Sequence, residues 1–427
     1  MIFSESTIKN MKIAFYIKNK PISSVDFRDV ENGNPGVGGS EFSAILISTV
    51  LCKNKNIETI LLCDENSLFP NELKWKSCTN FLGAIRYCKK HSYDYLVVDN
   101  KLLSKHIVLR YHNIKFIAWA NTFIPELDLH FYSRQPNIVK IVNVGKEQNE
   151  LYKHLKIYEK SCYIYNAVPT SILQDYQQHF LPNSQRENNV VYIGSLMPYK
   201  GFHILAQAWP HVLKEIPNAQ LYVIGSGKLY NRRNKLGKWE IAPETYENEF
   251  MQHLTLDGAI LPSVHFLGIL GKQKYDIFSK CKVGVPNPSG VSETFGYTAV
   301  EMQLMGCLVT TIKCPGYLDT VYDKANLYES TDQLGNKIVE LLKSKNDNYS
   351  AVMNYIASFD VNKIVAQWET LLCSLESSAI KNTKITNTSW NEKLALSTNR
   401  IVNYAYFYID VYYTMLKSII KKMIRRQ

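Results

Sequence analysis

Short apolar segments alternate with helical segments along this chain, and that alternation constrains the fold more than any other feature. The apolar segments are expected to be strands, and they cover residues 12–17, 59–63, 95–98, 116–120, 138–144, 163–166, 189–196, 221–224, 264–268, 283–285 and 308–312. Strands that alternate with helices predict a parallel sheet with helices on both faces, which is an α/β fold. Ligands in such folds bind beyond the carboxyl ends of the strands. The loops that follow these strands are therefore the first places to look for function.

Composition narrows the class of protein. The chain has 427 residues, of which 46% are hydrophobic and 20% charged, so it is long enough for two or three globular domains. Its net charge of +11 favours an anionic partner, such as a nucleotide, a phospholipid or a nucleic acid. The nine cysteines form no Cys-x-x-Cys pair and the ten histidines are dispersed, which predicts reduced thiols in a cytosolic protein and no zinc site. The N-terminus lacks the pattern of a signal peptide, and no run of about 18 apolar residues predicts a membrane span.

The segment 286–301 carries the most specific pattern in the chain. It joins the strand predicted at 283–285 to a helix predicted over 295–305, through a loop rich in proline, serine and glycine. Two carboxylates, Glu293 and Glu301, flank the start of that helix. Free amides at a helix N-terminus form an anion site together with the helix dipole, and a phosphate ester would fit the amides of Thr294, Phe295 and Gly296. Carboxylates beside a phosphate would repel it, so we expect both to accept hydrogen bonds from hydroxyl groups of a ribose or a sugar.

Two glycine-rich loops follow predicted strands elsewhere. Residues 32–41 include Gly38 and Gly39 just before a predicted helix, and glycine there would let the backbone touch a diphosphate or its sugar. Residues 189–201 repeat the order of strand, loop and helix, with Lys200 at the start of the helix. A lysine in that position can reach a phosphate as a point charge, although the helix dipole disfavours a cation there.

These motifs resemble those of glycosyltransferase family 4, whose members are retaining enzymes. The resemblance rests on Glu293 and Glu301, which form a Glu-x7-Glu pattern that begins Glu-x-Phe-Gly. It also rests on Gly-Val-Gly-Gly-Ser-Glu at 36–41 and on Gly-x-Leu-x3-Lys-Gly at 194–201. The similarity extends over about residues 11–375 and is strongest over 190–319.

Three positions depart from the family pattern. Ser195 stands where an arginine is usual, which removes one of two expected diphosphate cations, and Arg232 or Arg233 is a candidate to replace it. Asn121 stands where many members have histidine, and its amide can form hydrogen bonds but cannot act as an acid or a base. Met302 replaces the alanine that usually follows the second glutamate.

The resemblance implies a GT-B fold, in which two Rossmann-like domains face each other across a cleft. We expect an N-terminal, acceptor-side domain at 1–180 and a C-terminal, donor-binding domain at 186–375. The expected catalytic residues are Lys200, Glu293 and Asn121. The expected donor-binding residues are Gly38, Gly39, Ser195, Lys200, Phe266, Glu293, Thr294, Phe295, Gly296 and Glu301. The family needs no divalent metal, so neither a metal nor a cofactor is expected.

The C-terminal part of the chain differs from the rest. Residues 376–399 are rich in serine, threonine and asparagine, as in a linker, and residues 400–427 combine aromatic residues with five cations after Asp410. Such a tail suits a helix that lies at a lipid interface. An additional helix docked on the body of the protein fits the same residues.

The sequence therefore predicts a retaining, metal-independent hexosyltransferase that moves a sugar from a nucleotide-diphosphate sugar to a saccharide acceptor. UDP is the expected nucleotide because it is the commonest, and GDP stays open. The basic tail suggests a lipid-linked acceptor, as in bacterial surface polysaccharide biosynthesis, and a cytoplasmic enzyme at the inner face of the plasma membrane. One alternative is a GT-B epimerase that acts on a nucleotide sugar. Another is a basic protein that binds nucleic acid, but the interleaved aromatic and basic residues that this requires occur only in the tail.

Overall fold

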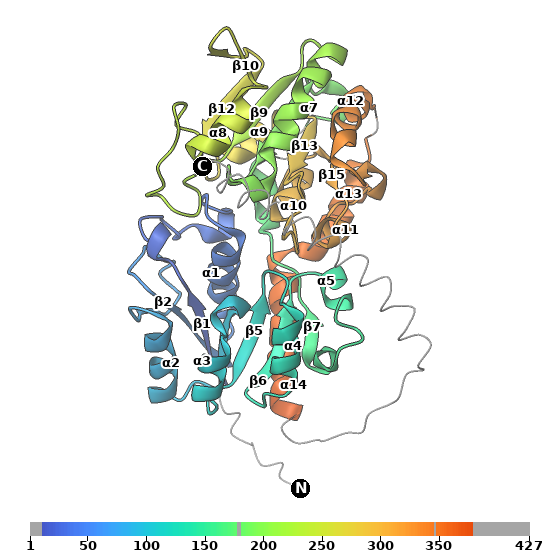
Figure 1. The fold of residues 1–427 in the computed structure, drawn as a ribbon. Coiled ribbons are helices and arrows are strands. Elements are labelled where there is room, and N and C mark those ends of the chain that lie inside the picture. Colours follow the sequence, from blue (N-terminus) through green and yellow to red (C-terminus); the bar gives the residue numbers. More distant parts are fainter. Residues whose placement is uncertain (1–10, 177–180, 346, 379–427) are drawn as a thin grey trace.

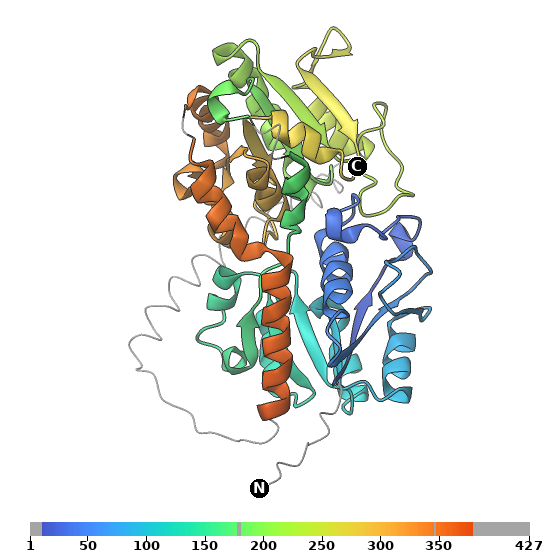
Figure 2. The same ribbon diagram turned by 180° about the vertical axis from the view of Figure 1, so that it is seen from behind.

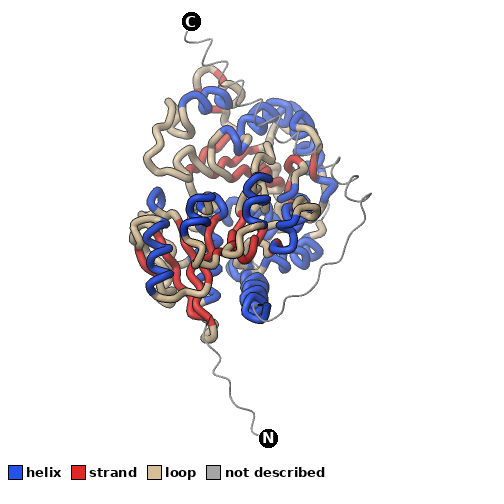
Figure 3. The backbone as a smooth tube through the Cα atoms, turned by 60° about the horizontal axis from the view of Figure 1, so that its bottom comes forward, coloured by secondary structure: helices blue, strands red, loops and turns tan. Residues whose placement is uncertain are grey.

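The structure is a computed structural model that describes residues 11–176, 181–345 and 347–378. Two α/β domains lie one above the other, the N-terminal domain in blue to teal and the C-terminal domain in green to orange (Figure 1). Helices surround the strands of both domains (Figure 3). Residues 379–427, which include the whole predicted tail and most of the predicted linker, lie outside the described residues.

The N-terminal domain is built on a seven-stranded parallel sheet with the order β3-β2-β1-β4-β5-β6-β7. Its strands are β1 Met11–Ile17, β2 Ile57–Cys63, β3 Trp75–Ser77, β4 Tyr95–Asp99, β5 Phe116–Ala120, β6 Ile138–Asn143 and β7 Ser161–Tyr163. Alternate residues of β1 enter two separate hydrophobic clusters: Ile13 and Phe15 lie in one, and Ala14 and Tyr16 in the other. A strand that is buried on both faces must be apolar along its length, which explains the continuous apolar runs in the sequence.

Helices cover both faces of this sheet. They include α1 Gly39–Leu51, α2 Phe81–Lys90, α3 Lys105–Arg110, α4 Glu126–Ser133 and α5 Lys146–Glu150. The short helix α6 Leu173–Tyr176 packs instead against the C-terminal domain, where the hydroxyl of Tyr176 donates to Asp276. Helix α2 shows why a sequence of this kind starts a helix, because the side chain of Asn80 accepts a hydrogen bond from the amide of Gly83 and caps the first turn. Its apolar face, with Ala84 and Ile85, packs in the same cluster as Ala14 of β1.

The C-terminal domain contains a five-stranded parallel sheet with the order β12-β9-β8-β13-β14. Its strands are β8 Asn189–Ile193, β9 Gln220–Ile224, β12 Val264–Gly268, β13 Val283–Pro286 and β14 Leu308–Val309. Two small two-stranded sheets accompany it, β10 Thr255–Leu256 with β11 Ala259–Ile260, and β15 Thr311–Ile312 with β16 Leu327–Tyr328. The helices are α7 Phe202–Glu215, α8 Glu244–Met251, α9 Lys274–Lys280, α10 Tyr297–Leu304, α11 Pro315–Thr320, α12 Leu334–Lys343 and α13 Tyr349–Ile356.

Several predicted elements differ from the observed ones. The strand predicted at 308–312 is divided at Thr310 into β14 and β15, which belong to different sheets. The strand predicted at 163–166 ends at Tyr163 instead of beginning there. Helix α11 begins at Pro315, because proline is well suited to the first position of a helix, where no amide donor is needed.

The last described helix, α14 Val361–Ser378, returns to the N-terminal domain and lies against its sheet, in front of it in the view of Figure 2. Trp368 on α14 is fully buried, and its ring centroid lies 5.9 Å from that of Phe15 and 5.0 Å from that of Trp119. The range 186–375 that we assigned to the C-terminal domain therefore includes a helix whose apolar face belongs to the N-terminal core. None of the helices in the described residues is both long and apolar enough to cross a membrane.

The two chain segments that connect the domains lie side by side. Val168 and Asp360 form an isolated parallel bridge, in which the amide of Val168 donates to the carbonyl of Phe359 at 2.8 Å. The two connections between the domains are therefore next to each other and bonded to each other.

Asp319 of α11 joins the domains at a second place. Its Oδ2 accepts a hydrogen bond of 2.9 Å from the amide of Glu147, at the start of α5, and its Oδ1 accepts one of 3.2 Å from the hydroxyl of Tyr165. Burial raises the pKa of Asp319 from 3.8 to about 6, and the neighbouring Glu147 carboxylate adds to the effect. The folded protein therefore holds a proton on Asp319 more tightly than the unfolded chain does.

This shift predicts how stability depends on pH. The contribution of Asp319 is fully present below pH 3.8 and is lost as the pH rises through about 6, because the folded state then carries a buried charge. The loss amounts to about 2–3 kcal/mol. An asparagine side chain cannot ionise, so Asp319→Asn is expected to exceed the wild type in stability at pH 7 by about this amount and to match it near pH 4. Urea unfolding of both proteins across this range checks the prediction, with the exposed Asp332→Asn as the control. Parallel curves for Asp319→Asn and the wild type would contradict it.

Candidate functional site

A cavity of about 970 Å³ lies between the two domains. Its walls include residues at the carboxyl ends of four strands: Ile17 of β1, Asp99 of β4, Ile193 of β8 and Asn287 directly after β13. Strands β1 and β4 are neighbours where the strand order of the N-terminal sheet reverses, and β8 and β13 are neighbours where that of the C-terminal sheet reverses. Ligands of open parallel sheets bind at such points. Both sheets can therefore contact one ligand in this cavity.

The cavity brings together all but one of the predicted site residues. Those that line it are Gly38, Gly39, Asn121, Ser195, Lys200, Glu293, Thr294, Phe295, Gly296 and Glu301. The exception is Phe266, whose ring packs in the C-terminal core with its centroid 6.0 Å from that of Phe202 and 6.3 Å from that of Phe250. Side chains alternate along a strand, so part of the segment 264–268 must face the core. The structure thus places the Phe266 side chain outside the candidate site, and Leu270, after the strand, lines the cavity instead.

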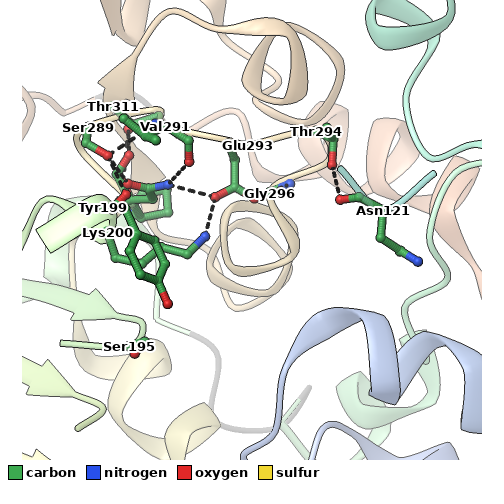
Figure 4. Close-up of polar contacts among 12 residues, drawn as sticks. Asn121, Ser195, Tyr199, Lys200, Ser289, Val291, Glu293, Thr294, Gly296 and Thr311 are labelled. Carbon is green, nitrogen blue, oxygen red and sulfur yellow. Dashed lines mark hydrogen bonds and ion pairs between the residues drawn. The ribbon is translucent and has the colours of Figure 1, made fainter. Parts of the chain in front are cut away.

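Lys200 and Glu293 come from different loops and form one ion pair. Lys200 ends a single turn at Pro198–Lys200, and Gly201 then adopts a φ of 67° that suits glycine before α7 begins. Nζ of Lys200 lies 2.9 Å from Oε2 of Glu293 (Figure 4). The two side chains are only 19% and 15% exposed, so the pair lies in the wall of the cavity and not on the outer surface.

Hydrogen bonds fix the carboxylate of this pair. Oε2 of Glu293 also accepts from Nδ2 of Asn287 at 2.9 Å, and Oε1 accepts from the amide of Gly296 at 3.1 Å. Burial alone would raise the pKa of Glu293, but the charge of Lys200 and these hydrogen bonds hold that pKa below its ordinary value. Burial would lower the pKa of Lys200, but the charge of Glu293 raises it above its ordinary value. Both groups are therefore charged at neutral pH, and a ligand meets a preformed pair.

Helix α10 begins at Tyr297, two residues later than predicted, and Gly296 precedes it with a φ of 77°. The amide of Gly296 donates to Glu293, so one of the three amides that we assigned to a phosphate is already used within the protein. The first turn of α10 lines the cavity, and the first amides of a helix have no partners inside it. The amides that this helix offers to the cavity are therefore those of the first turn of α10 and not that of Gly296.

Asn121 connects this turn to the other domain. Its carbonyl accepts a hydrogen bond of 2.7 Å from Oγ1 of Thr294, which belongs to the C-terminal domain (Figure 4). Its side-chain Oδ1 is buried and has no hydrogen-bond partner among the described residues. Buried polar atoms are usually paired, so this amide oxygen suits a donor group of a ligand. Ser195 is 1% exposed, and its Oγ is likewise buried with no hydrogen-bond partner among the described residues. It lies apart from the Lys200–Glu293 pair (Figure 4).

Glu301 has partners that the sequence did not reveal. Its Oε1 accepts hydrogen bonds from Nζ of Lys274 at 2.7 Å and from the hydroxyl of Tyr275 at 2.8 Å. The side chains of Lys274 and Glu301 are 2% and 4% exposed, so this ion pair is almost completely buried. Lys274 and Tyr275 were missed because a lysine and a tyrosine at the start of an ordinary helix, α9, form no recognisable pattern. Within the described part of the chain all of these bonds use Oε1, which leaves Oε2 for a ligand.

Gly38 and Gly39 stand at the start of α1, which also faces the cavity. A Cβ atom on Gly39 would lie 2.9 Å from Cδ2 of Tyr297, so glycine lets α1 approach α10 from the opposite domain. The hydroxyl of Tyr297 then donates to the carbonyl of Ala167 at 2.7 Å. Across residues 11–176, 181–345 and 347–378 no group of three or more His, Cys, Asp or Glu side chains is arranged to hold a metal ion.

Sequence comparison gives one family match. Residues 187–344, which make up most of the C-terminal domain, match the family model of glycosyl transferases group 1. A search of curated proteins finds no match.

Solved structures resemble the chain over nearly its whole described length. A glycosyltransferase from Rickettsia africae ESF-5 is 13% identical with a TM-score of 0.60, over 88% of this chain and 100% of its own. AviGT4, a glycosyltransferase involved in avilamycin A biosynthesis, is 12% identical with a TM-score of 0.57, over 86% and 98%. A trehalose-6-phosphate protein from E. coli, bound with UDP-2-fluoro glucose, is 10% identical with a TM-score of 0.56, over 85% and 98%. These similarities show the GT-B fold, and together with the family match they support a glycosyltransferase.

Proposed function

We propose that this protein is a retaining glycosyltransferase that uses a nucleotide-diphosphate sugar, with UDP as its nucleotide. The observation that carries the proposal is the Lys200–Glu293 pair, which lines the cavity beside the first turn of α10. An ammonium group and the positive end of a helix suit the negative charge that develops on a leaving diphosphate. The UDP-2-fluoro glucose bound to the E. coli protein of similar fold supports the choice of UDP.

Four of the residues that line the cavity then have roles in the reaction. Lys200 stabilises the departing diphosphate, Oε2 of Glu301 accepts a hydroxyl of the ribose, and Glu293 and Asn121 bind hydroxyls of the transferred sugar. The bond between C1 of the sugar and the diphosphate oxygen breaks as the acceptor oxygen attacks from the same face. The proton of the acceptor hydroxyl passes to the departing diphosphate, so no protein base is required, in keeping with an amide at position 121.

A thermal-shift panel of UDP, GDP and their sugar conjugates tests this proposal. UDP and at least one UDP-sugar should raise Tm, and EDTA should leave both the shift and the transfer activity unchanged. Radiolabelled donor then separates a transferase from an epimerase, because only a transferase needs an acceptor for turnover. Failure of every nucleotide to raise Tm would overturn the proposal, and strict dependence on Mn²⁺ or Mg²⁺ would overturn its metal-independent form.

The acceptor is proposed to be a lipid-linked saccharide at the inner face of the plasma membrane, as in the biosynthesis of bacterial surface polysaccharides. The support is the composition of residues 400–427, which lie outside the described part of the chain and carry five cations after Asp410. Each Lys or Arg close to an anionic bilayer contributes about 1 kcal/mol to binding. The motifs that predict the site end well before this tail, and the described residues that line the cavity all precede residue 302.

Deletion of residues 400–427 should therefore abolish binding to anionic liposomes and slow transfer to a lipid-linked acceptor. Transfer to a short water-soluble acceptor should persist, because the cavity is intact. Liposome flotation and the two transfer assays check this prediction. A truncated protein that precipitates or unfolds would show that the tail is a structural helix docked on the body.

A further inference from the structure

The segment between β9 and α8, residues 228–243, crosses from the C-terminal domain toward the N-terminal domain; we call it the strap. Glu247 of α8 fixes the base of the strap, because its fully buried carboxylate accepts backbone hydrogen bonds from Trp239 at 2.7 Å, Ile241 at 2.8 Å and Ala242 at 3.0 Å. A buried carboxylate with three amide donors is a strong local restraint. The strap therefore has a defined shape.

Arg232 fastens the strap to the opposite domain. Its Nη2 donates to the carbonyl of Gly36 at 2.9 Å, and Gly36 belongs to the glycine-rich loop before α1. Its Nη1 donates to the carbonyl of Lys228 at 3.2 Å, within the strap itself. The guanidinium group is thus held by backbone carbonyls and does not line the main cavity, so Arg232 does not supply the diphosphate cation that is missing at Ser195.

The strap places Tyr230 in the main cavity. Cε1 of Tyr230 lies 3.2 Å from the position of a Cβ on Gly38, so the ring covers the start of α1 closely. Tyr230 lines the same cavity as Lys200 and Glu293. Tyr230 as a whole is 40% exposed, and no hydrogen bond among the described residues involves its hydroxyl.

The cavity needs a further donor at this point. Lys200 is bound to Glu293 at 2.9 Å, so its single charge is already shared, and a diphosphate carries at least two negative charges. A phenol hydroxyl can donate to a phosphate oxygen without bringing a charge that would compete with Lys200 for Glu293. Tyr230 meets this requirement, and it enters the cavity from the strap and not from α10.

We propose that Tyr230 donates its hydroxyl to the diphosphate of the nucleotide-sugar donor, and that Arg232 is a positioning residue that holds it there through Gly36. The inference rests on the proposed function, because it assumes a nucleoside diphosphate in this cavity. The strap is then part of the donor site, and the contact of Arg232 with Gly36 in the other domain holds the strap in place.

Calorimetric titration of UDP and of uridine separates a phosphate contact from a general effect on the site. Tyr230→Phe should weaken UDP binding about tenfold and leave uridine binding unchanged, because only the hydroxyl is lost. Its Tm should stay at the wild-type value, since that hydroxyl has no partner within the described part of the protein. Arg232→Ala should weaken UDP binding to a similar extent, while the neighbouring and exposed Arg233→Ala should have no effect.

The outcomes distinguish this inference from the proposed function. If the wild type binds neither UDP nor GDP, the proposed function fails and this inference fails with it. If the wild type binds UDP and Tyr230→Phe binds it equally well, the inference alone is overturned. Equal losses of UDP and uridine binding would also overturn it, since they would show that Tyr230 shapes the cavity without contacting the phosphates.

Discussion

Lys200→Ala is expected to lower kcat roughly 10²–10³-fold, which corresponds to about 3–4 kcal/mol of lost transition-state stabilisation. KM should change much less, because the charge on the diphosphate grows as it leaves and Lys200 interacts most strongly with that developing charge. Lys200→Arg keeps a cation near Glu293 and should recover part of the rate. Steady-state kinetics with a saturating acceptor gives both constants for each variant.

Two further measurements make this result interpretable. Lys214→Ala removes an exposed lysine near the end of α7 and should match the wild type in both constants. Thermal unfolding of Lys200→Ala shows how much of the effect comes from leaving Glu293 without its counterion in a site that is 15% exposed. A folded Lys200→Ala variant with the wild-type kcat would mean that the leaving group is stabilised elsewhere.

Glu301→Ala is expected to destabilise the protein by about 3–5 kcal/mol, because it leaves Lys274 buried without a counterion. From the sequence alone, the same substitution would be expected to weaken nucleotide binding in a protein that stays folded. The 2% exposure of the Lys274 side chain changes that expectation, because a buried ammonium group depends on its counterion. Urea unfolding of the variant measures the loss.

A double substitution separates stability from binding. Glu301→Met combined with Lys274→Met removes both charges, and buried ion pairs can often be replaced by apolar residues at little cost, so most of the stability should return. Nucleotide binding should not return, because Oε2 of Glu301 is absent. If the double variant binds UDP like the wild type, the ribose role of Glu301 is wrong. If Glu301→Ala is as stable as the wild type, the buried pair contributes nothing to the fold.

The sequence predicted the parts of the site that follow strands directly. Lys200 and Glu293 come 93 residues apart in the chain but meet because each follows a strand next to the point where the order of its sheet reverses. The pattern of apolar runs is enough to place such residues, since the carboxyl ends of parallel strands share one edge. The parallel sheets were predicted correctly for the same reason.

Other parts of the site depend on contacts that leave no trace in a local pattern. Lys274 begins a helix whose composition is ordinary, and only the packing of α9 against α10 makes it the partner of Glu301. Tyr230 lies in a polar segment whose path is set by the buried Glu247 and by a contact of Arg232 with another domain. Phe266 was predicted to lie in the site but packs in the core. The family motif indicates that the segment 264–268 lies near the site, but it does not say which side chains of that segment face the core.

The packing of α14 in the N-terminal core shows how the chain is divided between the two domains. Residues between Val168 and Asp360 leave and re-enter the N-terminal domain at adjacent points, so the C-terminal domain is an insertion into a discontinuous N-terminal domain. Such an insertion can rotate about the line through its two attachment points but cannot slide or twist freely. The cleft should therefore open as a single hinge at the Val168–Asp360 bridge. An N-terminal fragment that stops before α14 would lack Trp368 and expose the apolar surface around Phe15 and Trp119. A fragment in which the insertion is replaced by a short linker would keep that contact and lose only the residues that the insertion adds to the same cluster, such as Phe295, Val300 and Leu304.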